Sequence, residues 1–172
     1  FVMAGTRGCD EYGESWHEGG KMEKKLNSFD DFIAVADYLV QEGYTSRDKM
    51  CIYGGSNGGL LVGVAFTQRP DLYQAVVCQV PLLDMKRYNK LLAGASWMGE
   101  YGNPDIAEEW AYIQKYSPYQ NVKKDGDYPR VFFTTSTRDD RVHPGHARKM
   151  VAKMSEMGHD VLYFENTEGG HA

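Results

Sequence analysis

The chain has 172 residues, of which 42% are hydrophobic and 13% aromatic, and its formal net charge is −5 at pH 7. This length and composition suit one globular domain with one core and exclude a disordered chain. The acidic balance argues against a nucleic-acid partner, and no apolar run approaches the roughly 18 residues of a membrane-spanning helix. Cys9, Cys51 and Cys78 are too few and too scattered for a disulfide framework, so we expect reduced thiols and a cytoplasmic location.

Strands and helices are expected to alternate along the first half of the chain. The opening residues, 1–4, resemble the middle of a strand, and a long loop rich in glycine and charge follows over 5–25. Apolar residues at helical spacing predict a helix that Asn27 or Ser28 caps and Gly43 ends. A strand at 50–53 and a helix to about Arg69 come next.

The second half continues the alternation. Strands are predicted at 75–80, 130–135 and 160–164, helices at 106–115 and from Pro144 to Gly158, and an irregular aromatic segment over 81–102. A continuous apolar run such as 75–80 is typical of a parallel strand that is covered on both faces. The pattern therefore predicts an α/β domain with a mainly parallel, doubly wound sheet and helices on both faces.

The chain is organised around Gly54-Gly55-Ser56-Asn57-Gly58, which lies between a predicted strand and a predicted helix. It fits Gly-x-Ser-x-Gly, the nucleophile elbow of the α/β-hydrolase fold. We expect a strained backbone at Ser56, close passage of strand and helix at Gly54 and Gly58, and an oxyanion donor in the backbone N–H of Asn57. The alternative is a glycine-rich turn with an inert serine.

A serine nucleophile needs a base and a group that orients the base, and α/β-hydrolases order these Ser, Asp or Glu, His along the chain. Two loops after Ser56 lie where strands of a parallel sheet end, and they carry Asp139 with Asp140 and, further on, His171. The residues alone do not decide between the two carboxylates. Residues 138–141 are all charged, and their alternative interpretation is a solvated cluster.

The other histidines are less suitable as a base. His17 precedes the serine, whereas His143, His146 and His159 fall at helix or strand boundaries, where we expect surface or capping residues. In isolation His171 would be an ordinary loop residue, and only its order after Ser56 singles it out.

The chain resembles the peptidase domain of the prolyl oligopeptidase family over its whole length. The matching segments are Arg7-Gly8, Glu11-Tyr12-Gly13-Glu14-Ser15-Trp16-His17, Phe29-Asp30-Asp31-Phe32, Glu42-Gly43-Tyr44-Thr45-Ser46, Gly54-Gly55-Ser56-Asn57-Gly58-Gly59, Gln68-Arg69-Pro70-Asp71-Leu72, Asp139-Asp140-Arg141-Val142 and Gly170-His171. Asn57 after the serine favours members that cleave after proline over relatives that cleave at dibasic sites.

The resemblance implies a serine endopeptidase with an α/β-hydrolase fold that hydrolyses short proline-containing peptides through an acyl-enzyme. It implies Ser56 as nucleophile, His171 as base and Asp139, rather than Asp140, as the orienting group. It further implies a proline pocket and a carbonyl-binding arginine; these residues are Trp97, Tyr101, Leu82, Val142 and Arg141. For Trp97 the alternative is ordinary core packing. We predict no cofactor and no metal.

Several family features lie outside these residues. The resemblance places an N-terminal β-propeller, the first strands and a tyrosine oxyanion donor before residue 1, and a last helix after residue 172. We therefore expect residues 1–172 to be a partial peptidase domain, truncated at both ends. An acylaminoacyl peptidase or a carboxylesterase with the same triad is the alternative function, and an inactive binding or folding fragment is a third hypothesis.

Overall fold

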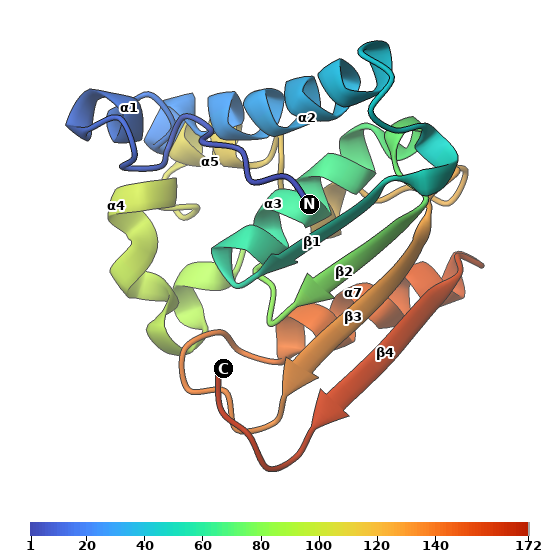
Figure 1. The fold of residues 1–172 in the computed structure, drawn as a ribbon. Helices are drawn as coiled ribbons and strands as arrows, with labels where there is room; N and C mark the ends of the chain where they lie inside the picture. Colours follow the sequence, from blue (N-terminus) through green and yellow to red (C-terminus); the bar gives the residue numbers. More distant parts are fainter. Residues whose placement is uncertain (172) are drawn as a thin grey trace.

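A parallel four-stranded sheet organises the chain (Figure 1). The structure is a computed structural model and describes residues 1–171. The strands are β1 (Cys51–Gly55), β2 (Ala75–Gln79), β3 (Arg130–Ser136) and β4 (Val161–Asn166), in the spatial order β1-β2-β3-β4. All three strand pairs are parallel. The expected α/β fold with a mainly parallel sheet is therefore confirmed.

Helices occupy most of the connections between the strands. The longer ones are α2 (Leu26–Gln41), α3 (Asn57–Gln68) and α7 (Gly145–Glu156), and the shorter ones are α1 (Glu14–Glu18), α4 (Met98–Tyr101), α5 (Ala107–Ile113) and α6 (Pro118–Asn121). Single turns of 3₁₀ helix lie at η1 (Met22–Lys24), η2 (Arg47–Lys49), η3 (Pro70–Leu72) and η4 (Tyr88–Lys90), and η5 (Leu92–Trp97) is a longer one. The segment expected to be irregular, 81–102, thus contains η4, η5 and α4.

The structure corrects two expectations near the start of the chain. Residues 1–4 form no strand, because no strand within residues 1–171 pairs with their backbone, and the segment lies beside α2 instead. The long loop over 5–25 contains α1 and η1. Asn27 and Ser28 lie inside α2 and do not cap it, since their side chains donate to the carbonyl oxygens of Gly19 and Arg7.

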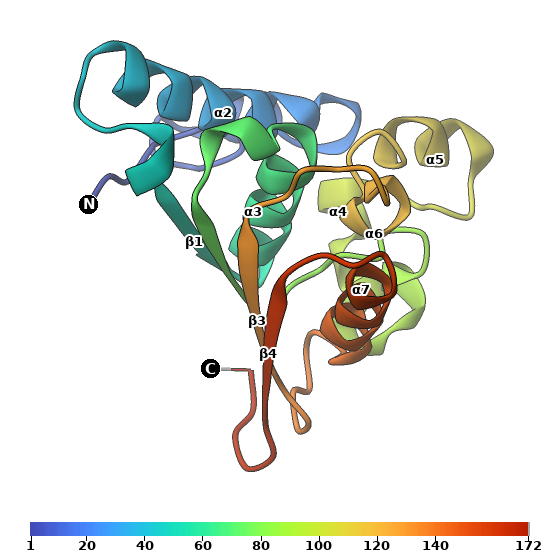
Figure 2. The ribbon, with the colours of Figure 1, turned by 90° about the vertical axis from the view of Figure 1, so that its right-hand side faces the viewer.

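The helices cover one face of the sheet, which differs from the expected helices on both faces (Figure 2). Parallel crossovers are right-handed, so a strand order that advances in one direction places each connecting helix on the same side. The opposite face carries a row of aligned apolar side chains: Tyr53, Val77, Phe132 and Leu162. Helices on both faces are the expectation because the strands carry apolar residues on both faces, but within residues 1–171 helices cover only one face.

Two clusters of buried side chains form the core. One lies between the sheet and helices α2, α3 and α7, and includes Ile52, Val76, Val131, Phe66 and Met150. The other lies beside the first half of α3, and includes Leu60, Val64, Leu82, Tyr101 and Val142. The second cluster brings the segment over 82–116 against the elbow. No helix within residues 1–171 is long and apolar enough to cross a membrane.

Candidate active site

The turn between β1 and α3 presents Ser56 in a strained backbone conformation. Its φ is 57° and its ψ is −115°, in the left-handed half of backbone space that side chains other than glycine rarely occupy. A Cβ atom at Gly54 would lie 2.1 Å from the carbonyl oxygen of Gly58, so strand and helix do pass in contact there. The expectation that Gly58 itself must lack a Cβ is wrong, because a Cβ there would have no atom of residues 1–171 within 4 Å apart from its chain neighbours and its own helix backbone. The second obligatory glycine is Gly59, whose Cβ would lie 2.8 Å from Pro81.

Ser56 and His171 meet at the carboxyl end of the sheet although 115 residues separate them. The Nε2 atom of His171 lies 3.1 Å from the Oγ atom of Ser56, and its Nδ1 atom lies 2.7 Å from Oδ2 of Asp139. An ionised carboxylate only accepts hydrogen bonds, so the Nδ1 atom carries the proton and Nε2 offers its lone pair to the serine hydroxyl. This tautomer can take the serine proton during an attack on a carbonyl carbon.

The two neighbouring carboxylates after β3 have opposite environments. The side chain of Asp139 is fully buried, and its Oδ1 atom accepts hydrogen bonds of 2.9 Å from the backbone N–H groups of Arg141 and Val142. Asp140 is exposed and accepts no such hydrogen bonds from the residues that the structure describes, 1–171. The turn therefore directs Asp139, and not Asp140, at His171.

Hydrogen bonds join the loop that carries His171 to the end of β3 and the residue after it. Ser136 donates its hydroxyl hydrogen to the carbonyl oxygen of Gly169, and the backbone N–H of Thr137 donates to the carbonyl oxygen of Asn166 over 2.9 Å. These bonds hold the two loops of the site against each other, so the distance between the acid and the base is set by the backbone.

The apolar residues expected to line a proline pocket come together beside the elbow. Leu82, Tyr101 and Val142 are buried in one cluster, and Trp97 is half-buried against it. The hydroxyl of Tyr101 donates to Oδ1 of Asn57 over 2.5 Å, which links this cluster to the residue after the serine. Burial raises the pKa of Tyr101, so the phenol stays protonated and able to donate.

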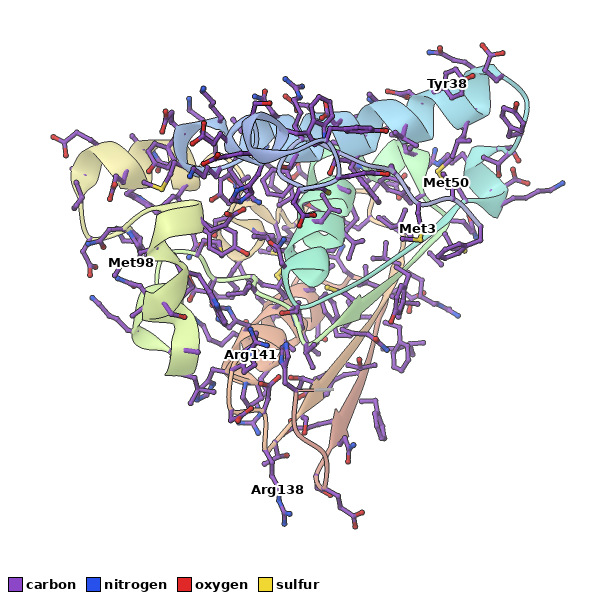
Figure 3. All side chains as sticks on the ribbon, turned by 60° about the vertical axis from the view of Figure 1, so that its left-hand side comes forward. Met3, Tyr38, Met50, Met98, Arg138 and Arg141 are labelled. Atoms are coloured by element: carbon purple, nitrogen blue, oxygen red, sulfur yellow. The ribbon has the colours of Figure 1, made fainter. Side chains whose placement is uncertain are left out.

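Arg141, labelled in Figure 3, is exposed, and its backbone carbonyl oxygen accepts a hydrogen bond of 3.2 Å from the N–H group of Ala93 in η5. Its backbone is fixed by Asp139, and its side chain is free of partners among residues 1–171. The figure also shows Arg138 at the tip of the loop, directed away from the site. Of the two arginines, only Arg141 is therefore placed to meet a ligand.

A cleft of about 410 Å³ opens beside Ser56 and His171 along the ends of β2, β3 and β4. Besides Ser56 and His171, its lining combines polar side chains with the apolar side chains of Val80 and Phe164; the polar ones are Gln79, Thr134, Thr135, Ser136 and Asn166. Trp97 and Tyr101 do not line this cleft, since they belong to the cluster next to α3. The serine thus stands between this cleft and the apolar cluster. Within residues 1–171 no group of three or more His, Cys, Asp or Glu side chains is arranged to hold a metal ion.

One histidine differs from its expected role, and one lysine was not singled out by the sequence. His146 is not at the surface but 1% exposed, and its Nδ1 atom accepts from the backbone N–H groups of Leu83 and Asp84. Lys25 is 3% exposed and is paired with Glu100, 75 residues away. The sequence contains no signal for either, because burial of these polar groups depends on long-range contacts.

Comparison with known proteins places the chain among peptidases. The family model described as the prolyl oligopeptidase family matches residues 1–172. An uncharacterized peptidase of Sinorhizobium fredii is 52% identical over 172 residues, covering 100% of this chain and 24% of that protein. A prolyl endopeptidase of Dictyostelium discoideum is 44% identical over 155 residues, covering 90% of this chain and 20% of that protein. The chain thus spans about a quarter or less of these relatives.

Solved structures agree with the sequence relatives. One, from an analysis of two prolyl endopeptidases, is 48% identical with a TM-score of 0.94 and covers 96% of this chain and 25% of its own. Another, a post-proline cleaving enzyme from Rickettsia typhi, is 42% identical with a TM-score of 0.95 and covers 97% of this chain and 24% of its own. The α/β-hydrolase fold expected from the elbow is therefore confirmed, and the chain belongs to the prolyl oligopeptidase family of peptidases.

Proposed function

We propose that the chain carries the catalytic centre of a serine endopeptidase that hydrolyses short peptides on the carboxyl side of proline. The observation that supports this most is the continuous chain of hydrogen bonds from Ser56 through His171 to the buried Asp139. The similar proteins named as prolyl endopeptidases and as a post-proline cleaving enzyme supply the substrate class.

In the proposed reaction the Oγ atom of Ser56 attacks the carbonyl carbon of the proline residue, and its proton passes to Nε2 of His171. The negative charge on the carbonyl oxygen is stabilised by the backbone N–H of Asn57 at the start of α3. His171 then gives the proton to the leaving amine, and the C–N bond breaks to leave an acyl-enzyme. A water molecule, deprotonated by His171, attacks the ester carbon, and Ser56 leaves with the proton restored. Asp139 holds the imidazole in the required tautomer throughout.

We assign proline selection to the apolar cluster next to the elbow. The flat indole of Trp97 suits a rigid pyrrolidine ring, and Leu82, Tyr101 and Val142 supply the rest of an apolar pocket. Arg141 binds the carbonyl group of the residue before proline, because a guanidinium group makes directed hydrogen bonds. We predict no cofactor and no metal for this reaction.

The complete polypeptide is proposed to contain more than this chain, since residues 1–172 span about a quarter of the relatives. We propose that residues 1–172 are part of its peptidase domain, and that an N-terminal β-propeller and a further oxyanion donor lie in the rest. A cytoplasmic location likewise remains a prediction.

A substrate panel on the complete polypeptide tests this function. A fluorogenic Gly-Pro amide should be hydrolysed far faster than simple esters, N-acylated amino-acid amides or Arg-Arg amides. Preference for esters or for N-acylated amino acids would favour a carboxylesterase or an acylaminoacyl peptidase with the same triad. A fluorophosphonate should label Ser56 in the wild type and not in Ser56→Ala, and absence of labelling in the wild type would favour a catalytically inactive binding or folding module.

A further inference from the structure

An ion pair with a buried lysine lies beside the apolar cluster. The Nζ atom of Lys25, at the junction of η1 and α2, donates to Oε1 of Glu100 in α4 over 2.9 Å. The other carboxylate oxygen of Glu100 lies 3.0 Å from Nε2 of His17, in α1. The side chain of Lys25 is only 4% exposed, which makes it far less accessible to water than the other ion-paired lysines within residues 1–171, Lys21, Lys90 and Lys149. His17 and Lys25 thus each contact one oxygen of the Glu100 carboxylate in α4.

The pair is in contact with the residue that reaches the elbow. The Nζ atom of Lys25 lies 5.4 Å from the centre of the Tyr101 ring, within the range of a cation–π interaction. Tyr101 follows Glu100 directly and donates its hydroxyl hydrogen to Asn57. Contacts therefore run from Lys25 through the Tyr101 ring to the residue whose backbone N–H faces the reacting carbonyl in the proposed mechanism.

The electrostatics are consistent with a fixed geometry. Burial opposes ionisation of Glu100, but the charge and hydrogen bond of Lys25, together with His17, outweigh it and lower the pKa of the carboxyl group. A buried pair of this kind contributes little net stability, because desolvation offsets the attraction between the charges. What it does provide is a directed contact that fixes α4 relative to α2.

We propose that Lys25 and Glu100 are positioning residues for substrate selection, which set Tyr101 and the neighbouring Trp97 against Asn57 and the elbow. This inference rests on the proposed function, because it concerns the pocket of the same site. Neither residue touches the substrate or the triad. Their effect is transmitted through Tyr101.

A double-mutant cycle in the complete polypeptide tests whether the effect of Lys25 on substrate selection passes through Tyr101. Lys25→Met removes the buried charge and keeps most of the side-chain volume, and should lower kcat/KM for a Gly-Pro amide by about 3- to 100-fold. Tyr101→Phe should also lower it, and the double variant should be close to the more damaged single variant. Fluorophosphonate labelling of Ser56 should change much less. Lys25→Arg, which retains a charge for Glu100, should recover most of the lost selectivity.

The matched control is Lys90→Met, the same substitution in the exposed pair of Lys90 with Asp105, which should change kcat/KM by less than about 2-fold. Losses that multiply in the double variant, or an equal fall for proline amides and for labelling, would overturn the proposal. If Lys25→Met does not fold, Glu100→Gln replaces it in the same cycle.

Hydrogen exchange separates this inference from the proposed function. Lys25→Met should speed amide exchange across 92–102 and leave the strands unchanged, whichever substrate the wild type prefers. A wild type that cleaves no proline amide contradicts the proposed function, while faster exchange in the variant still supports positioning. Unchanged exchange across 92–102 contradicts the positioning role even if proline amides are cleaved.

Discussion

At the scale of single residues, the environment of a side chain decides its role more than its type. Asp139 and Asp140 are adjacent and chemically equal. The side chain of Asp139 is fully buried and accepts hydrogen bonds from two backbone N–H groups, whereas Asp140 is exposed. Only the buried carboxylate can hold an imidazole in one tautomer without competition from water.

Asp139→Asn should therefore lower kcat by about 10²–10⁴-fold, because the amide disfavours the tautomer that the proposed mechanism needs. Asp140→Asn, the matched control, should change kcat by less than about 2-fold. Steady-state kinetics on a Gly-Pro amide measures both. Equal losses in the two variants would show that the orienting group is misassigned.

Trp97→Ala should reduce transition-state binding of a proline substrate by roughly 1–3 kcal/mol, the usual scale of one apolar pocket contact. A small activated ester, which does not fill the pocket, should lose much less. The ratio of kcat/KM for the two substrates measures the effect. If both fall equally, Trp97 supports the apolar cluster and does not select proline.

At the scale of elements, the elbow depends on how closely α3 passes β1 and the loop after β2. The glycines in this turn are not equivalent, since an added Cβ would meet backbone at Gly54 and Gly59 but open space at Gly58. Their sequence spacing does not reveal this difference, because the clashing atoms at Gly59 belong to Gln79 and Pro81.

Gly59→Ala should destabilise the fold by about 1–3 kcal/mol or more, because backbone and proline atoms must shift to admit a methyl group. Gly58→Ala should be neutral, or stabilising by up to about 1 kcal/mol, since alanine favours a helix. Urea unfolding of the two variants gives the comparison. A Gly58→Ala variant as unstable as Gly59→Ala would contradict the assigned contacts.

Helix α7 is joined to the loop after β2 by a buried histidine. Burial lowers the pKa of His146 to about 4; Asp84 acts against this change, and Lys149 and His143 act with it. Protonation would remove the acceptor of two backbone N–H groups, so the folded state requires the neutral ring.

This burial predicts acid sensitivity. The unfolded chain binds a proton at His146 near the ordinary pKa of 6.5, whereas the folded chain binds it only near 4. The contribution of neutral His146 to the free energy of unfolding is therefore fully present above pH 6.5 and is lost as the pH falls towards 4. At about 1.4 kcal/mol per unit of pKa difference, this contribution is on the order of 3 kcal/mol. Urea midpoints of wild type and His146→Gln from pH 7 to 4 test this, and parallel curves would contradict it.

At the scale of the whole molecule, the uncovered face of the sheet is the main feature. Tyr53 and Leu162 are 63% and 49% exposed, at the two ends of an apolar row that crosses all four strands. An apolar surface of this kind favours association when nothing else covers it.

The 172-residue chain by itself should therefore self-associate. Size exclusion should show oligomers or aggregates, and Tyr53→Thr with Leu162→Thr should shift the distribution towards the monomer. Thermal melts followed by circular dichroism check that the variant keeps its fold. A monodisperse wild-type monomer would show that the open face is tolerated in water.

The sequence by itself determined the order of the four strands and of the three longer helices, the elbow at Ser56 and the identity of His171 as the candidate base. These features depend on local patterns: apolar runs, a glycine-flanked serine and a fixed order along the chain. The family resemblance already implied Asp139, but only the tertiary structure shows why it rather than Asp140 meets His171. Only the tertiary structure shows the need for Gly59 rather than Gly58, the burial of His146 and the pair of Lys25 with Glu100. Each depends on atoms that are distant in sequence or on the direction of a turn, and no local pattern records where such atoms meet.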